Sequence, residues 1–254
     1  MKAHHNLIVT TSWDDGQKSD IKLAKILSEY GIKGTFYITK SYGNPLENDE
    51  ILKISRYHEI GAHTLNHPVL TEITKNEVEN EIFGSKKYIE NIIGITIPMF
   101  CYPKGVYNES IKKIVDEAGF IGARTCNPLM PRSNIFDYDP FELPVSLHAS
   151  NGSPRLSFLL WKNYRLSLRA LFDWELRSKE LFDRLLQNGG VFHLWGHSWE
   201  IFKSEEFNKL KRVLQYISEN DSVTYMTNGE LLSNNLFNHK NMGLNKKSEG
   251  NRVP

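Results

Sequence analysis

The chain has 254 residues, and its 31 Lys and Arg nearly balance its 30 Asp and Glu, which leaves a formal net charge of +1. This balance argues against a protein that binds nucleic acid by neutralising phosphates, and against a polybasic membrane adaptor. Two cysteines, Cys101 and Cys126, rule out a disulfide scaffold and a cysteine-only zinc module.

The length fits one large domain with a sizeable core. The segment before the first apolar run is short and polar, with six residues, and no apolar stretch approaches the ~20 residues that span a bilayer. We therefore expect a cytoplasmic protein with no membrane span.

Strand-like and helix-like runs alternate along the chain. Short β-branched or apolar runs predict strands at 7–11, 35–38, 60–63, 98–102, 121–124, 142–147, 191–195 and 223–226. Apolar residues at helical spacing predict helices over 20–30, 48–57, 75–93, 109–118, 166–187 and 205–218. Asp20, Thr74 and Asn108 are the candidate caps, and Thr74 has capping-box spacing to Glu77.

Irregular segments interrupt this alternation at 127–140, which holds three prolines, and at 148–159. Residues 1–232 are expected to form the catalytic domain, and the Asn-, Lys- and Ser-rich residues 233–254 a polar, flexible tail. Repeated strand–helix units indicate α/β architecture with a parallel sheet. Seven or eight such units fit a (β/α) barrel, and an open doubly wound sheet is the alternative.

Residues of metal-binding or acid–base type follow the predicted strands, and the ends of barrel strands share one rim. Asp14 and Asp15 follow the first strand in Ser-Trp-Asp-Asp-Gly. Two buried carboxylates repel each other unless a cation lies beside them, so that one binds metal while the other handles protons. Gly16 permits the sharp exit from the strand. The alternative is an ordinary strand-end turn with Asp as a helix cap.

His63 and His67 follow the third strand, and residues four apart share one side of a helical turn. Two imidazoles placed in this way suit one divalent ion. Pro68 disfavours α conformation at His67, so the turn should end there. The alternative is a pair of core or solvent-facing histidines.

Two histidines belong to the predicted strand at 191–195 and its end. His193 lies within the strand, where a core histidine with satisfied hydrogen bonds is the simpler interpretation. His197 follows Gly196 at the rim, where it suits a general acid. Glu200 either partners His197 or caps the next segment.

These segments resemble the motifs of the polysaccharide deacetylases, the NodB-homology group also called carbohydrate esterase family 4. Ser-Trp-Asp-Asp-Gly is similar to the family's Thr-Phe-Asp-Asp-Gly, and His63-Thr-Leu-Asn-His67 to its His-Ser/Thr-x-x-His. The run from Phe100 to Gly105 resembles the Arg-x-Pro-Tyr segment, and His197 the histidine of the last motif.

The resemblance implies a distorted (β/α) barrel of about seven parallel strands. It also implies that Asp15, His63 and His67 bind the metal and that Asp14 takes a proton from a metal-bound water. By the same resemblance His197 protonates the leaving amine, and the backbone amide of Tyr102 helps to bind the oxyanion.

The chain departs from the family at the motif arginine, where Phe100 or Cys101 stands. Arg124 at the next strand end is a candidate replacement, with a surface salt bridge as the alternative. The His-Leu-Trp-Gly-His spacing leaves open whether His193 or His197 acts. His148 and Trp199 either line the pocket or lie exposed in loops.

The resemblance implies hydrolysis of an N-acetyl, or alternatively O-acetyl, group on a sugar or glycan precursor. A formyl-amine or ureide substrate and a non-catalytic carbohydrate-binding protein are the other hypotheses. One carboxylate and two imidazoles suit one divalent ion, zinc first, with cobalt, nickel or iron(II) as alternatives. No nucleic-acid partner is expected, and the oligomeric state is not readable.

Overall fold

The structure is a computed structural model, and it describes residues 7–129, 138–202, 206–218 and 220–234. The strands are β1 (Leu7–Trp13), β2 (Gly34–Ile38), β3 (Glu59–Ala62), β4 (Met99–Cys101), β5 (Gly122–Pro128), β6 (Leu143–Val145), β7 (Leu147–His148), β8 (Gly190–Gly196) and β9 (Val223–Tyr225). The helices are α1 (Asp20–Glu29), α2 (Asn48–Ser55), α3 (Lys75–Ile93), α4 (Glu109–Glu117), α5 (Pro154–Tyr164), α6 (Trp174–Asn188), α7 (Ser198–Ile201) and α8 (Glu206–Ile217).

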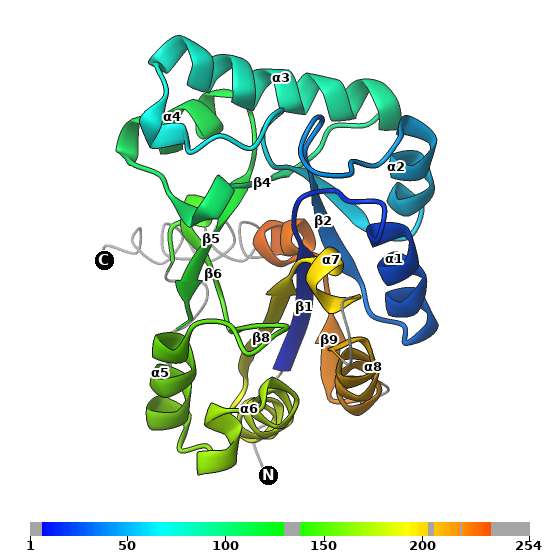
Figure 1. Cartoon of the computed structure of the whole chain (residues 1–254), viewed down its shortest axis with the longest axis vertical. Helices are drawn as coiled ribbons and strands as arrows, with labels where there is room; N and C mark the ends of the chain where they lie inside the picture. Colours follow the sequence, from blue (N-terminus) through cyan, green and yellow to red (C-terminus); the bar gives the residue numbers. More distant parts are fainter. Residues whose placement is uncertain (1–6, 130–137, 203–205, 219, 235–254) are drawn as a thin grey trace, which may run out of the picture.

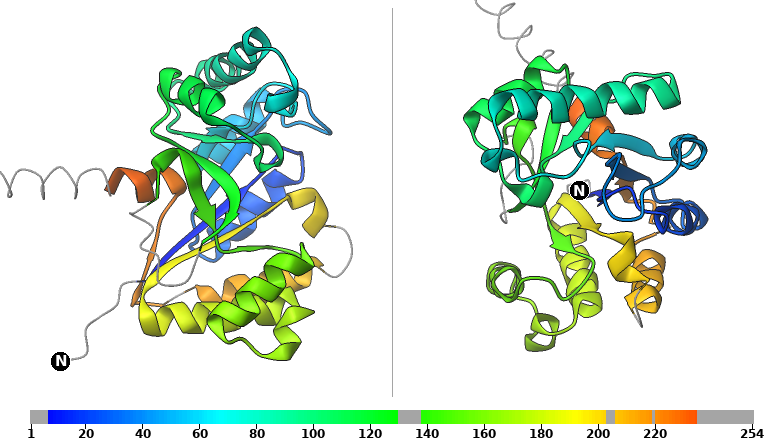
Figure 2. Two further views of the ribbon diagram at one scale, coloured as in Figure 1. Left: turned by 90° about the vertical axis from the view of Figure 1, so that its left-hand side faces the viewer. Right: turned by 45° about the horizontal axis from the view of Figure 1, so that its top comes forward.

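The strands form one parallel sheet that curves almost into a barrel. Its order is β6-β5-β4-β3-β2-β1-β8-β7, and β9 pairs with the first part of β1. The helices surround the strands, as Figure 1 and the right-hand view of Figure 2 show. The predicted distorted (β/α) barrel is therefore confirmed, with nine strands in the described residues where about seven were expected.

Closure of the barrel depends on Ser146. β6 pairs with β5 and β7 pairs with β8, so the chain crosses from one edge of the sheet to the other at this residue. The Ser146 amide donates to the His193 carbonyl at 2.9 Å, and its hydroxyl donates to the Val191 carbonyl at 3.1 Å. These bonds satisfy backbone groups that an open sheet edge would leave unpaired.

The core lies inside the sheet and beneath the helices. β1 is central in the sheet, and Leu7, Val9 and Trp13 on it are almost wholly buried. α3 begins as predicted, because Thr74 and Glu77 form the expected capping box. The Asn108 side chain accepts from the Ile111 amide at the start of α4, also as predicted.

The predicted irregular segment 148–159 is wrong, and the predicted helix over 166–187 is confirmed only from residue 174, because α6 begins at Trp174. α5 begins at Pro154, whose fixed φ suits the first turn of a helix. It ends at Arg165, which has a left-handed φ of 53°. The Asp173 side chain then accepts from the Glu175 amide and starts α6. Apolar residues at helical spacing precede Asp173, which is why periodicity alone placed the start of this helix at residue 166.

Part of the predicted loop at 127–140 and most of the predicted tail at 233–254 lie outside the described residues, whereas residues 228–234 are helical. Within residues 7–129, 138–202, 206–218 and 220–234, no helix combines the length and apolar character needed to cross a membrane.

Candidate metal centre and active site

A tight turn after β1 orients the two adjacent carboxylates. The Asp14 amide donates to the Gly196 carbonyl at 3.0 Å, which continues the β1–β8 pairing by one residue. Asp15 and Gly16 then adopt positive φ values of 81° and 64°. A Cβ at Gly16 would lie 3.1 Å from the Ile38 Cα, so glycine allows both the conformation and the close approach to β2.

Asp15, His63 and His67 converge on one point, although the histidines are far from Asp15 in sequence. The Asp15 Oδ1 atom lies 3.8 Å from His63 Nε2 and 3.6 Å from His67 Nε2. One potential ligand atom from each residue lies within 4.8 Å of the other two. His63 and Asp15 are buried, and the His67 side chain is 10% exposed. This donor set can hold one metal ion.

The sequence spacing suggested that the two histidines lie on a helical turn, but they do not. The backbone leaves β3 in an irregular bend in which Thr64 and His67 have left-handed φ values of 66° and 58°. Pro68 disfavours the right-handed helical region at His67. Glu81 of α3 accepts hydrogen bonds from two backbone amides of this bend, at 2.7 and 2.9 Å. The bend, rather than helical periodicity, brings the rings together.

Hydrogen bonding and stacking fix the orientation of both rings. His63 Nδ1 is bonded to the Cys101 carbonyl at 2.8 Å, so its Nε2 faces Asp15. The His67 ring stacks on Tyr42 with a centroid separation of 4.3 Å. Burial lowers the pKa of His63 to about 4, against the opposing effect of the Asp14 carboxylate. At neutral pH His63 is therefore the unprotonated imidazole that a metal requires.

Two further side chains hold Asp15, and the sequence interpretation did not assign these contacts. Trp199 donates its indole N–H to Asp15 Oδ2 at 2.9 Å, which leaves Oδ1 facing the histidines. Thr39 donates its hydroxyl to the Asp15 carbonyl at 2.8 Å. Thr39 follows β2 directly, so the strand-end pattern could have identified it. No sequence pattern identifies Trp199, because its contact with Asp15 depends on where α7 lies.

Asp14 forms a buried ion pair with Arg124. The Arg124 guanidinium donates to Asp14 Oδ1, and both side chains are almost fully excluded from solvent. Burial alone would raise the pKa of Asp14, but the charge of Arg124, followed by that of His63, lowers it to about 2. Arg124 therefore keeps Asp14 ionised. The alternative of a surface salt bridge for Arg124 is wrong, because the side chain is 0% exposed.

His197 lies beside Glu200 and His148. Its Nδ1 is 3.4 Å from Glu200 Oε2, and the same oxygen is 3.5 Å from His148 Nε2. Burial alone would lower the pKa of His197, but Glu200, Asp14 and Asp15 raise it above its usual value. Burial lowers the pKa of His148 to about 4. The arrangement favours the protonated form of His197.

His193 is a core histidine with both ring nitrogens hydrogen-bonded. Nε2 is 2.8 Å from the Ser12 hydroxyl, and Nδ1 is 3.0 Å from the Pro144 carbonyl. Burial lowers the pKa of His193 to about 3. The residue is fully buried within β8 and contributes to barrel packing, whereas His197 reaches the rim.

Tyr102 is buried at the end of β4. Its hydroxyl donates to the Phe141 carbonyl at 3.1 Å. Its backbone amide lies 3.4 Å from the Arg124 carbonyl, a long hydrogen bond that continues the β4–β5 pairing. The amide expected to bind an oxyanion therefore already has a partner in the barrel.

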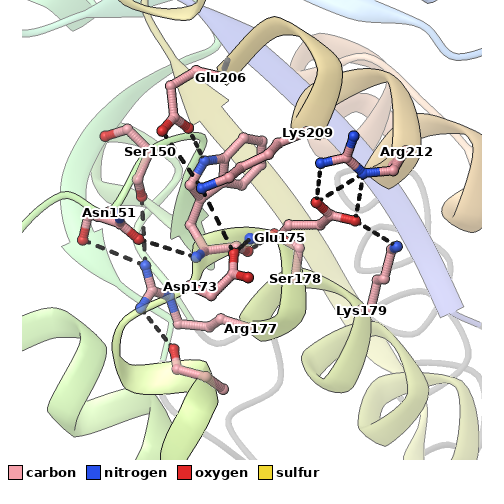
Figure 3. Close-up of polar contacts among 12 residues, drawn as sticks. Ser150, Asn151, Asp173, Glu175, Arg177, Ser178, Lys179, Glu206, Lys209 and Arg212 are labelled. Atoms are coloured by element: carbon pink, nitrogen blue, oxygen red, sulfur yellow. Dashed lines mark hydrogen bonds and ion pairs between the residues drawn. The ribbon is translucent and has the colours of Figure 1, made fainter. Parts of the chain in front are cut away.

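The loop that follows His148 is anchored by a buried arginine, as Figure 3 shows. Arg177 of α6 donates to the carbonyls of Ser150 and Asn151, each at 3.4 Å, and to that of Ala170 at 2.9 Å. The Ser150 hydroxyl is bonded to His148 Nδ1 at 2.7 Å. α6 thus helps to set the position of His148 at the rim.

Comparison with protein families places the first half of this chain. Residues 2–123 match the family model described as polysaccharide deacetylase. A peptidoglycan-N-acetylglucosamine deacetylase of Bacillus cereus is 29% identical over 44% of this chain and 54% of its own length. Chitin deacetylase 1 of Cryptococcus neoformans is 32% identical over 42% of this chain and 23% of its own length. The matched region thus spans about half or less of these relatives.

Solved structures extend the likeness to almost the whole fold. A Mycobacterium smegmatis protein has a TM-score of 0.68 at 15% identity, over 94% of this chain and 93% of its own. The chitin deacetylase of Colletotrichum lindemuthianum has a TM-score of 0.58 at 16% identity, over 88% of this chain and 86% of its own. At these sequence identities the similarity shows a shared barrel fold alone.

Proposed function

Because residues 2–123 match the family model described as polysaccharide deacetylase, we propose that the protein is a metal-dependent hydrolase of N-acetylated sugars. The convergence of Asp15, His63 and His67 beside the buried Asp14–Arg124 pair is the observation that carries the proposal. The names of the Bacillus cereus and Cryptococcus neoformans relatives support an acetylated amino sugar as substrate.

Asp15, His63 and His67 would hold the metal ion through one carboxylate oxygen and two Nε2 atoms. One carboxylate and two imidazoles suit zinc, with cobalt, nickel or iron(II) as alternatives. When bound, a divalent ion lowers the pKa of a coordinated water and polarises the acyl carbonyl. Trp199 positions Asp15 for this role, because its indole N–H is bonded to the other carboxylate oxygen.

Asp14 and His197 supply the acid–base pair. Asp14, held ionised by Arg124, accepts the proton of the attacking water. An amine leaves readily only when protonated, so an acid is needed on the other side of the substrate. His197, whose pKa Glu200 and the nearby aspartates raise against the effect of burial, donates that proton to the departing nitrogen.

The test is acetate release from N-acetylglucosamine-containing oligosaccharides and sugar precursors by protein of known metal content. We expect release with zinc or cobalt bound, its loss after chelation, and its return when metal is added back. A parallel panel of formyl-amines and ureides identifies the acyl group. The absence of acetate release with every metal and substrate would contradict the proposal.

Substitution of Asp14 by Asn tests the roles of the two aspartates separately. Asn keeps the size of the side chain but cannot accept a full proton, so Asp14→Asn should lower kcat by about 10²–10⁴-fold. The metal content should stay at the wild-type level, whereas Asp15→Asn should lose metal. An Asp14→Asn variant with unchanged activity and pH profile would show that another group is the base.

A further inference from the structure

A second group of metal-binding side chains lies beside the proposed active site. His148 ends β7, His197 directly precedes α7, and Glu200 belongs to α7. Glu200 Oε2 is 3.5 Å from His148 Nε2 and 3.4 Å from His197 Nδ1. The three donor atoms all lie within 4.8 Å of one another. None of them belongs to the Asp15, His63 and His67 set.

The spacing of these atoms suits a zinc-like ion. Zinc bonds of about 2.0–2.1 Å place neighbouring ligand atoms of a tetrahedron about 3.4 Å apart. Both separations from Glu200 Oε2 are close to this value. A simple ion pair between His197 and Glu200 would not require His148. His148 provides a third donor directed at the same carboxylate oxygen.

The surroundings also resemble those of a metal site. Metal-binding histidines usually have the other ring nitrogen hydrogen-bonded, which fixes the ring. His148 meets this condition, because its Nδ1 is bonded to the Ser150 hydroxyl at 2.7 Å. The side chains of His148, His197 and Glu200 are 12%, 22% and 32% exposed, whereas the facing atoms His197 Nδ1 and Glu200 Oε2 are themselves shielded from solvent.

We infer that His148, His197 and Glu200 form a second, weaker site for a divalent cation of the zinc type, and that its occupation inhibits the enzyme. The inhibitory part rests on the proposed function. A cation on Nδ1 occupies the position that a proton takes in the imidazolium form of His197. The ring then cannot act as the strong acid that protonates the leaving amine, so excess metal slows turnover.

The binding test is a Zn²⁺ titration of the full chain by calorimetry, with direct metal analysis. A His4→Ala/His5→Ala background removes the neighbouring histidines of the N-terminus as competing ligands. We expect two zinc ions per chain. His148→Asn and Glu200→Gln should each weaken the affinity for the second zinc ion by about tenfold or more and leave the affinity for the first unchanged. Glu29→Gln, an exposed position on α1, is the control and should change neither.

X-ray absorption of the background protein with two zinc ions bound gives a result that needs no further variant. If His63 and His67 bind one zinc and His148 and His197 bind the other, the average is two imidazoles per zinc. An average of one imidazole per zinc would contradict the second site. A single zinc per chain up to about 1 mM, or a second zinc that neither variant weakens, would overturn the inference. None of these measurements requires turnover, so they remain decisive if the proposed activity fails.

Acetate release tests the inhibition separately. Zinc beyond the first equivalent should slow the background protein, and His148→Asn should raise the half-inhibiting zinc concentration by about tenfold. Inhibition at the same concentration in both proteins would show that zinc acts elsewhere.

Discussion

At the scale of single residues, the Asp14–Arg124 pair decides the charge of the site. A carboxylate this deeply buried would take up a proton if it were alone. The guanidinium of Arg124 lies over the Trp195 ring at 4.7 Å and donates to the carboxylate, so the pair stays ionised. The arginine comes from β5, a different strand from the one on which the family motif would place it.

This pair makes stability depend on pH at the acid end. The pKa of Asp14 falls from 3.8 in the unfolded chain to about 2 in the folded protein, so its contribution is complete above pH 4. It should disappear as the pH falls from 4 towards 2, with a loss of about 2 kcal/mol in the free energy of unfolding. Urea unfolding over this range should show the loss.

The control for this prediction is Arg124→Met, which leaves the Asp14 carboxylate buried without its partner. We expect the variant to lose about 3–5 kcal/mol at pH 7. It should also lose the Asp14 contribution to the pH dependence, because the pKa of Asp14 then rises. An equally steep loss below pH 4 in the variant would show that other carboxylates are responsible.

At the scale of elements, the exit from β1 determines whether Asp15 reaches the histidines. Gly16 and Gly31 provide a matched pair, because their φ values are 64° and 65°. A Cβ at Gly16 meets Ile38 at 3.1 Å, whereas a Cβ at Gly31 meets nothing within 4 Å.

Gly31→Ala should lose about 1 kcal/mol of stability, from backbone strain alone. Gly16→Ala should lose more and should also bind metal more weakly, because the turn that carries Asp15 must move. Thermal unfolding and metal analysis of both variants test this. Equal stability losses with unchanged metal content would exclude a special role for the turn.

The arginines of α6 and α8 illustrate how burial changes the value of a polar contact. Figure 3 shows Arg177 directed at backbone carbonyls and Arg212 forming an ion pair with Glu175. Arg177 is 3% exposed, whereas the Arg212 side chain is 51% exposed. Arg177→Met should lose about 2–3 kcal/mol, because several buried carbonyls lose a charged donor. Arg212→Met should lose less than about 1 kcal/mol.

Urea unfolding of the two arginine variants measures the difference. Amide hydrogen exchange should also increase around residues 148–153 in Arg177→Met only, because that loop loses its anchor. Similar stability losses in both variants would mean that the carbonyl contacts of Arg177 add little.

The sequence predicted the elements well where local chemistry is decisive. The Thr74–Glu77 capping box, the Asn108 cap and the apolar strands are recognisable because each uses residues close together in the chain. α5 was missed because its segment was predicted to be irregular, and α6 was predicted to begin at residue 166, since its true start depends on a cap at Asp173 that follows further apolar residues.

At the scale of the whole molecule, closure of the barrel brings His148 and His197 to the same rim. Ser146 joins the two edges of the sheet and accepts from the His193 amide at 2.9 Å through its hydroxyl. Ser146→Ala should lose about 1–3 kcal/mol, because buried backbone groups of β8 lose their partner. Ser110→Ala, at an exposed position in α4, is the control.

Hydrogen exchange distinguishes a closure effect from a general loss of stability in the Ser146 variant. The amides of β6, β7 and β8 should exchange faster, while those of β2 and β3 on the opposite side keep their protection. A uniform increase over the whole sheet would contradict a local role for Ser146.

The sequence alone determined the alternation of strands and helices and the residue types gathered at the strand ends, because these follow from local periodicity and composition. Periodicity left a barrel and an open sheet as alternatives, and it was the resemblance of the motifs to the polysaccharide deacetylases that implied the barrel. Only the tertiary structure decided that Arg124 is buried against Asp14, that an irregular bend pairs His63 with His67, and that Glu200 faces two histidines. Each of these contacts joins residues whose distance depends on backbone conformation and barrel closure, and spacing along the chain does not encode either of them.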